Sequence, residues 1–159
     1  MQAPKGGGAR ERPVADSIAF LGAVEMARLV RDRALSPVEI VDSCLAQIER
    51  LQPSLDALVT VVAQQARATA TMAEDRVMRG DALGPLHGVP IVITDVLDTA
   101  GVRTTRGAAL RAQHVPMQDA LLVARLKRAG AILLGKANTT PYAAGFGAAS
   151  ELHGPTRNP

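Results

Sequence analysis

The sequence predicts an α/β fold in which N-terminal helices precede short buried strands with covering helices. Apolar residues recur at helical spacing through much of the first half of the chain. Beyond Gly84, short apolar runs rich in β-branched residues alternate with a further helical segment. The order helix, glycine, strand is typical of layered α/β domains.

Composition favours one globular domain with an aliphatic core. The chain has 159 residues, of which 47% are hydrophobic and 21% are charged, so it can bury a core of its own. Aromatic residues make up only 2%, so the core depends on Ala, Leu, Val and Ile. This scarcity, together with basic residues that are scattered despite a net charge of +3, argues against a nucleic-acid partner.

We expect a flexible basic arm over residues 1–16, followed by a single domain over residues 17–159. The arm is rich in glycine and charge and lacks the apolar segment of a secretory signal. No stretch of the chain reaches the length of a membrane span. Cys44 is the only cysteine, so no internal disulfide can form, and we expect a cytoplasmic protein.

The clearest local signal is a helix that starts after Ser36. Ser36 can cap this helix, Pro37 suits its first position, and Glu39 can complete a capping box. Pro53 is expected to end it. Its apolar stripe consists of Val41, Cys44, Leu45, Ile48 and Leu51. Because Cys44 lies on this stripe, it is interpreted as a core residue rather than a nucleophile.

Two further helices are predicted on either side of this one. A helix over residues 24–33 has three apolar residues on one side, Met26, Leu29 and Val30. A long Ala-rich helix is predicted over residues 56–79, with Gly80 as its C-terminal cap. Its inward stripe consists of Val59, Val62, Ala63, Ala66, Ala70, Ala73 and Val77.

Two buried strands are predicted in the second half of the chain. Residues 89–93 follow a Gly/Pro loop and are apolar on both alternating faces, which suits a parallel or mixed sheet. A helix over residues 119–129, capped by Asp119, is expected to end at Gly130. Residues 131–134 then form the second strand.

Residues 130–137, GAILLGKA, nearly match the phosphate-binding pattern G-x-x-x-x-G-K-[ST]. A phosphate-binding loop lies between a strand and a helix, with free backbone N–H groups. Here the four central residues are the predicted strand, and the helix precedes the first glycine. In addition, Ala137 has no hydroxyl group to bind Mg²⁺. We therefore expect no bound nucleotide.

Three ordered stretches resemble the amidase signature family. Residues 84–95, GPLHGVPIVITD, followed by DTAGV at 98–102, are similar to its lysine-bearing segment. Residues 125–138, RLKRAGAILLGKAN, resemble the next block, and residues 154–159, GPTRNP, resemble the run that leads into its Gly/Ser-rich signature. The resemblance covers roughly residues 20–159.

This resemblance implies a fragment of the amidase signature fold, with a partial mixed β-sheet and covering helices. It also implies hydrolysis of amide C–N bonds in small-molecule amides, without a metal or a cofactor. The family's catalytic unit is a serine nucleophile, a second serine in a cis peptide, and a neutral lysine that accepts a proton through the second serine.

In the matching segment, Thr94 occupies the lysine position. A threonine hydroxyl is far too weakly basic to act as a general base at neutral pH. Both serines are expected after Asn158 and Pro159, where the Gly/Ser-rich signature would follow. The sequence therefore gives no catalytic, cofactor-binding or metal-binding residue, and we expect this chain to be a truncated, inactive member of the family.

Other polar residues are interpreted as structural. Asp95 follows a strand, where a turn or capping role is usual. His87 lies in a Pro/Gly loop without an identifiable serine or cysteine partner, and His114 and His153 are weaker candidates still. Lys136 could be considered as a substitute base, but the resemblance places it outside the triad, in a structural or rim role.

Three accounts of the chain stay open at this point. It is an inactive piece of an amidase, a retained non-catalytic binding or regulatory protein, or one half of a split amidase completed by a second chain. Residues 137–142 depart from the family's usual run near the acyl pocket, so substrate preference is not carried over. Unpaired sheet edges predict a marginally stable chain that self-associates.

Overall fold

The computed structural model describes residues 18–158, so the predicted arm over residues 1–16 lies outside the described part. The elements in chain order are α2 (Ala23–Arg31), α3 (Pro37–Leu55), β1 (Leu58–Val61), α4 (Ala63–Arg79), β2 (Pro90–Thr94), η1 (Ala109–Arg111), α5 (Leu121–Arg128), β3 (Ile132–Ala137), η2 (Pro141–Ala143), β4 (Ala149–Ser150) and β5 (Gly154–Pro155). None of the helices in this part is both long and apolar enough to cross a membrane.

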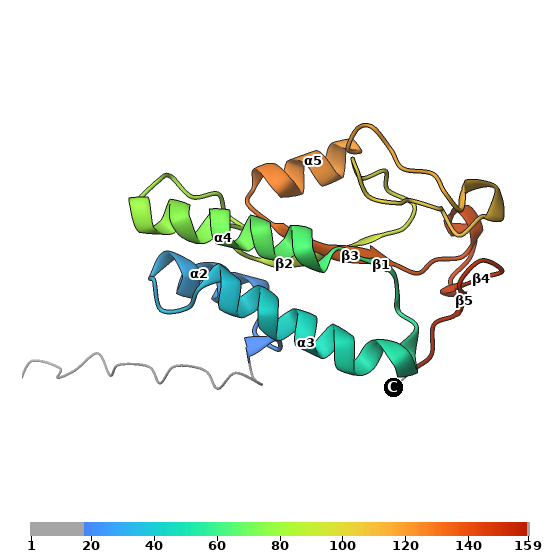
Figure 1. Cartoon of the computed structure of the whole chain (residues 1–159), viewed down its shortest axis with the longest axis horizontal. Helices are drawn as coiled ribbons and strands as arrows, with labels where there is room; N and C mark the ends of the chain where they lie inside the picture. The colour runs from blue at the N-terminus through green and yellow to red at the C-terminus, as the bar shows by residue number, and fades with distance from the viewer. Residues whose placement is uncertain (1–17, 159) are drawn as a thin grey trace, which may run out of the picture.

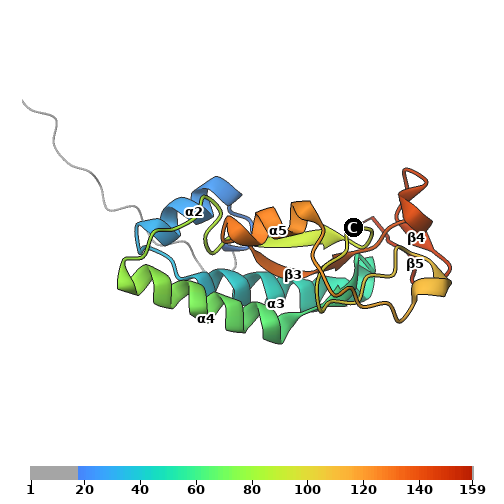
Figure 2. The ribbon, with the colours of Figure 1, turned by 90° about the horizontal axis from the view of Figure 1, so that it is seen from above.

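A three-stranded sheet lies at the centre of the fold, in the order β1-β3-β2. β2 runs parallel to β3, and β1 runs antiparallel to it, so the predicted mixed sheet is confirmed. Figures 1 and 2 show α5 on one side of this sheet and α3 on the other. β4 and β5 form a separate short hairpin near the end of the chain.

The two faces of the sheet bury different apolar clusters. Helices α3 and α4 cover one face, where they bury Val41, Leu45, Ala66, Ala70, Ala73, Ile132 and Leu134. Helix α5 covers the other face, where the cluster consists of Ile93, Val102, Val123 and Leu133. Ile132 and Leu134 therefore face α3 and α4, whereas Leu133 faces α5, as the alternation of a strand requires.

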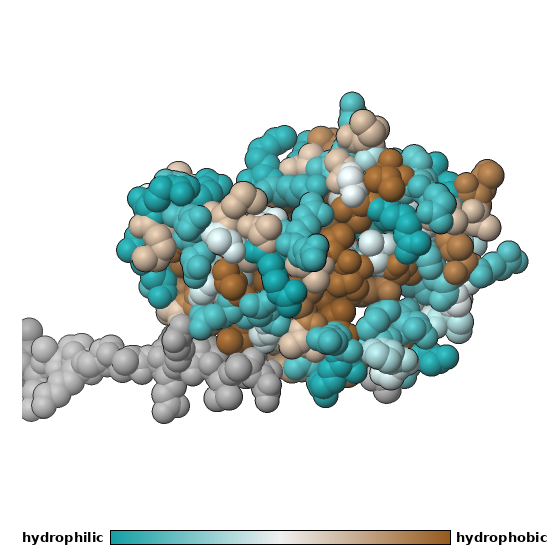
Figure 3. All heavy atoms as spheres, viewed as in Figure 1, coloured by the Kyte–Doolittle hydropathy of each residue, from teal (hydrophilic) through white to brown (hydrophobic). Residues whose placement is uncertain are grey.

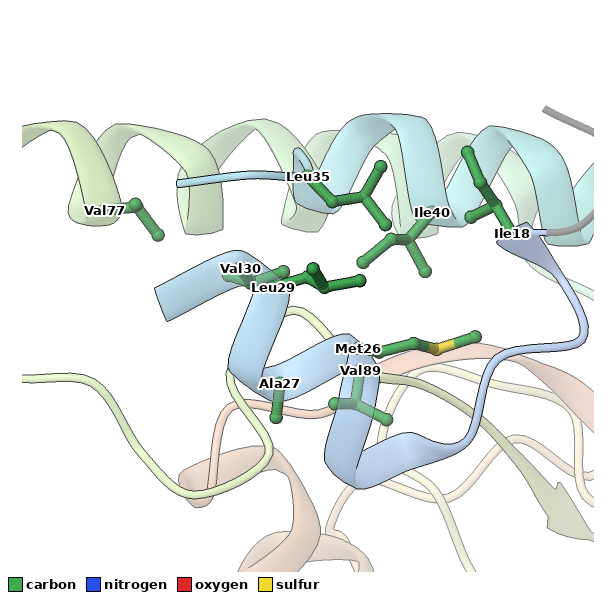
Figure 4. Close-up of a cluster of buried hydrophobic side chains, with 9 residues drawn as sticks. All are labelled: Ile18, Met26, Ala27, Leu29, Val30, Leu35, Ile40, Val77 and Val89. Atoms are coloured by element: carbon green, nitrogen blue, oxygen red, sulfur yellow. The ribbon is translucent and has the colours of Figure 1, made fainter. Parts of the chain in front are cut away.

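A third cluster joins α2 to the rest of the molecule. Met26, Leu29 and Val30 are buried on the predicted side of this helix. Figure 4 shows them between α3 and the loop that ends at Val89. The predicted start of α3 is also confirmed, because Ser36 Oγ accepts the Val38 N–H at 2.9 Å and the capping box is complete.

The prediction that Pro53 ends this helix is wrong. α3 continues to Leu55, and Asp56 follows in the left-handed conformation with its N–H bonded to Gln52 O. Pro53 lies in the last turn, where its missing N–H removes only one helical hydrogen bond. The Gln52 side chain then accepts the Leu58 N–H at 3.0 Å and donates to Leu58 O at 2.7 Å, which binds the helix end to β1.

The helix predicted over residues 56–79 is wrong over its first part. Residues 58–61 form β1, and α4 begins only at Ala63. A run dominated by valine and threonine favours a strand, and pairing with β3 stabilises it here. Val59 and Val62 therefore do not belong to the helical stripe, whereas the buried members Ala66, Ala70, Ala73 and Val77 and the cap at Gly80 are confirmed.

Asp119 does not cap α5, contrary to the prediction. The cap position is Ala120, and no side chain bonds to the helix N-terminus. The Asp119 carboxylate instead accepts the Ala100 N–H at 2.8 Å and binds Lys127 Nζ at 2.8 and 2.9 Å. A bond between distant segments thus replaces the local cap.

Gly135 allows β1 to approach β3 closely. A Cβ atom added to Gly135 would lie 2.3 Å from Thr60 O on the neighbouring strand. Such a contact is far inside van der Waals distance, and the obstacle is backbone rather than a mobile side chain. The pairing of β1 with β3 therefore depends on glycine at this position.

We expect Gly135→Ala to lower the free energy of unfolding by about 1–3 kcal/mol, because β1 must move away from β3. Chemical denaturation measures this change. Gly147→Ala is the matched control, since an added Cβ there meets nothing closer than 3.9 Å. Equal effects of the two substitutions would contradict the close-approach argument.

Candidate functional site

Thr94 is the last residue of β2, and its side chain is exposed. Successive side chains of a strand point to opposite faces. Because Ile93 is buried in the cluster under α5, Thr94 points to the face on which α3 lies. Val92 shares that face and lines a groove with residues of α3. The family's lysine position is thus at the strand end, on the α3 side of the sheet.

Lys136 lies on β3, and none of its surface is exposed. It is paired with Ile93 of the parallel strand β2. Paired residues of neighbouring strands point to the same face, so Lys136 points to the α5 side, away from Thr94. The predicted strand at residues 131–134 is longer than expected and includes this lysine. Gly135 and Lys136 are therefore strand residues, in agreement with the rejection of a phosphate-binding loop.

The Lys136 ammonium group binds the loop that follows β2. Its Nζ atom donates to Leu97 O at 2.5 Å, and to the Oγ1 atoms of Thr99 and Thr104 at 3.0 and 3.1 Å. Burial lowers the pKa of Lys136 to about 8, although the charge of Asp95 favours the protonated form. The three oxygen acceptors replace water around the buried amine, and they fix the course of residues 97–104.

Asp95 is fully buried and begins a chain of hydrogen bonds to the C-terminal hairpin. Its Oδ2 atom accepts the Thr105 N–H at 2.9 Å and the Thr105 hydroxyl. Thr105 Oγ1 in turn accepts the Gly107 N–H at 3.1 Å and lies 3.1 Å from His153 Nε2. Since the Thr105 hydroxyl proton is already donated, His153 Nε2 is the donor. Burial and the positive charge of Arg103 lower the pKa of His153.

The other residues considered in the sequence have structural surroundings. His87 is buried, and its Nε2 atom lies 2.9 Å from Ala73 O on α4, which makes it a donor to that carbonyl. Half-buried His114 donates its backbone N–H to Arg111 O. Cys44 is half-buried between two apolar clusters, and burial raises the pKa of its thiol, which disfavours the nucleophilic thiolate.

Sequence reasoning did not single out Asn138, which fixes the end of the described chain. Its Nδ2 group donates to Ala148 O at 3.3 Å, Gly154 O at 3.0 Å and Thr156 Oγ1 at 3.1 Å. These acceptors lie 10 to 18 residues further along the chain. An asparagine after a strand signals a turn, but a single sequence gives no sign of such distant partners.

The structure brings Asp95, Thr105 and His153 together and separates Thr94 from Lys136. Among residues 18–158, no three His, Cys, Asp or Glu side chains lie close enough together to hold a metal ion. The polar residues around the end of β2 therefore form a scaffold for two loops, and Thr94 stands at its exposed side.

Solved amidase structures share this arrangement. A bacterial aryl acylamidase of the amidase signature enzymes superposes with a TM-score of 0.80 and 28% identity, over 89% of this chain and 30% of its own. The peptide amidase from Stenotrophomonas maltophilia superposes with a TM-score of 0.81 and 26% identity, over 90% of this chain and 31% of its own. The fold is thus that of a part of an amidase.

The sequence comparisons agree with this likeness. The profile of the Amidase family matches residues 39–159. The A chain of the glutamyl-tRNA(Gln) amidotransferase from Halorhodospira halophila is 45% identical over 125 residues, and its counterpart from Carboxydothermus hydrogenoformans is 35% identical over 140 residues. The chain belongs to the amidase family. It spans only 26% and 29% of the length of these two relatives.

The buried amine of Lys136 predicts that the folded chain becomes more stable as the pH rises from about 8 to 10.5. Its pKa is lower in the folded state than in the unfolded chain, so the unfolded chain binds more protons in this range. The gain is at most about 3 kcal/mol. Denaturation at several pH values measures it, with Lys136→Met as the variant that lacks the gain.

Both proteins in this comparison should contain Cys44→Ala. The raised thiol pKa of Cys44 makes the folded state bind the extra proton, so it lowers stability with rising pH and would mask part of the effect. Parallel pH curves for the two proteins would contradict a lowered pKa of Lys136.

Proposed function

We propose that this chain forms the N-terminal part of an amidase-family hydrolase of amide C–N bonds, and that it does not hydrolyse amides by itself. One observation supports the second half of this proposal above all. Thr94 stands where the family resemblance places the lysine general base, at the exposed end of β2. The sequence and the fold agree on this correspondence, because the matched segment covers β2 and the loop after it.

No neighbouring group in the described part of the chain is placed to replace that lysine. Lys136 points to the opposite face of the sheet and is bound by the loop over residues 97–104. His153 is bound to Thr105, which is in turn bound to the buried Asp95. A general base must lie within hydrogen-bond reach of the proton that it accepts, and its loss alone slows such reactions by about 10² to 10⁴.

Three serines in the described part of the chain have structural bonds. Ser36 Oγ is bonded to Glu74 Oε1, Ser54 Oγ donates to Leu51 O, and Ser150 Oγ accepts the His153 N–H. The last of these contacts involves a backbone group rather than the imidazole ring. None of these three bonds therefore joins a hydroxyl to a lysine amine or a histidine ring, the bases that usually activate a serine.

The substrate class is proposed only as an amide. The relatives are named as a glutamyl-tRNA(Gln) amidotransferase, an aryl acylamidase and a peptide amidase, which differ in what they act on. A cytoplasmic location, with no nucleic-acid partner, fits the single half-buried cysteine and the scattered basic residues.

We expect the purified chain to show no turnover of glutamine or of simple aliphatic and aromatic amides. Ammonia release and amine release are the measurements. Thr94→Lys in the same chain should also be inactive, because a base without a nucleophile and oxyanion donors does not complete the relay. Turnover by the natural chain that Thr94→Ala abolishes would overturn the proposal.

A further inference from the structure

The half of α3 nearer its C-terminus leaves an apolar groove against the sheet. The groove has a volume of about 230 Å³. It is lined by Gln47, Ile48, Leu51, Gln52, Leu55, Ala57, Leu58 and Val92. Its polar lining residues are both uncharged, so an apolar partner would desolvate no charge there. Figure 3 shows hydrophobic side chains gathered in the region between α3 and the sheet.

One edge of β2 borders this groove and is unpaired. β3 has a partner on each side, whereas β2 pairs only with β3 within residues 18–158. Val92, in the middle of β2, is 43% exposed. Edge strands are usually protected by charged residues, but the sequence of β2, PIVIT, has none. The outer edge of β1 differs, because Arg103 donates to Val59 O at 2.8 Å.

The end of the described chain lies at the rim of the same groove. Thr156 Oγ1 donates to Asp56 O at 2.9 Å, and Arg157 N donates to Leu55 O at 2.8 Å. Leu55 is itself a lining residue of the groove. Figure 1 shows the C-terminus beside the end of α3. Any segment joined after residue 159 therefore starts beside the groove.

The groove and the open edge of β2 together are called the α3–β2 surface. We propose that this surface is the docking site of the amidase segment that follows the matched region in the relatives, the segment in which the family resemblance places both serines. This inference rests on the proposed function. The aryl acylamidase is matched over only 30% of its length, so most of that fold packs around the part that this chain shares.

Thr94 makes the same occupant chemically consistent. It shares the α3 side of the sheet with Val92, two residues away on β2. A segment that adds a strand beside β2 and fills the groove would cover Thr94 as well. The position of the missing base and the docking surface are then parts of one interface.

The first test supplies that segment as a separate chain. The part of the Halorhodospira halophila relative that follows its matched region is mixed with this chain, and light scattering and calorimetric titration detect the complex. We expect a one-to-one complex. Val92→Asp should weaken it at least about tenfold, because the carboxylate is buried without a partner. Met78→Asp on α4 is the control, since Met78 is 66% exposed and does not line the groove.

The second test joins the same segment after Pro159 in one chain. Val92→Cys and Met78→Cys are compared in a Cys44→Ala background by their rates of reaction with a maleimide. We expect the cysteine at position 92 to react at least about tenfold more slowly in the fused chain than in this chain alone. The cysteine at position 78 should react equally fast in both.

Three results would overturn the proposal. They are a complex that Val92→Asp leaves unchanged, equal labelling of position 92 in both chains, and a dimer of this chain alone that Val92→Asp converts to a monomer. The last would mean that the surface binds a second copy. Amide turnover by the chain alone would overturn the proposed function without changing any of these binding results.

Discussion

The pairing of β3 with a strand on each edge is the constraint on which the other contacts depend. β2 and β1 fix the position of β3, and its alternating side chains then determine what each helix can bury. Ile132 and Leu134 define the floor for α3 and α4, and Leu133 defines the floor for α5. A sheet of only three strands is small, so the helices supply most of the buried apolar surface.

The same alternation separates two residues that lie close together in the sheet. Thr94 and Lys136 are both at the carboxyl ends of the parallel strands, where functional residues of α/β proteins usually gather. One residue of difference in register sends their side chains to opposite faces. The buried lysine then organises the loop after β2, and the exposed threonine stays beside the α3–β2 surface.

Much of the fold could be predicted from the sequence because its signals are local. The capping box at Ser36, the glycine at the end of α4 and the apolar run of β2 depend only on neighbouring residues. The errors arise where distant partners decide. Residues 58–61 become a strand only because β3 is available to pair with them. Asp119 leaves its helix because Ala100 and Lys127 offer better partners.

The candidate site divides in the same way. The correspondence of Thr94 to the family's lysine depends on a local motif, and so it was accessible from the sequence. The contacts of Lys136 with Thr99 and Thr104 join residues 32 to 37 positions apart, and the contact of Thr105 with His153 spans 48. No pattern of spacing announces such bonds, because the turns between them set the geometry.

The exposure of Thr94 bears on how such a chain can change over time. A residue that contributes nothing to the core can be replaced without repacking, so mutational tolerance at position 94 is set by chemistry and not by folding. Lys136 is the opposite case, since any replacement leaves buried oxygens unsatisfied. Loss of the family's catalytic base and preservation of its architecture are therefore physically independent events.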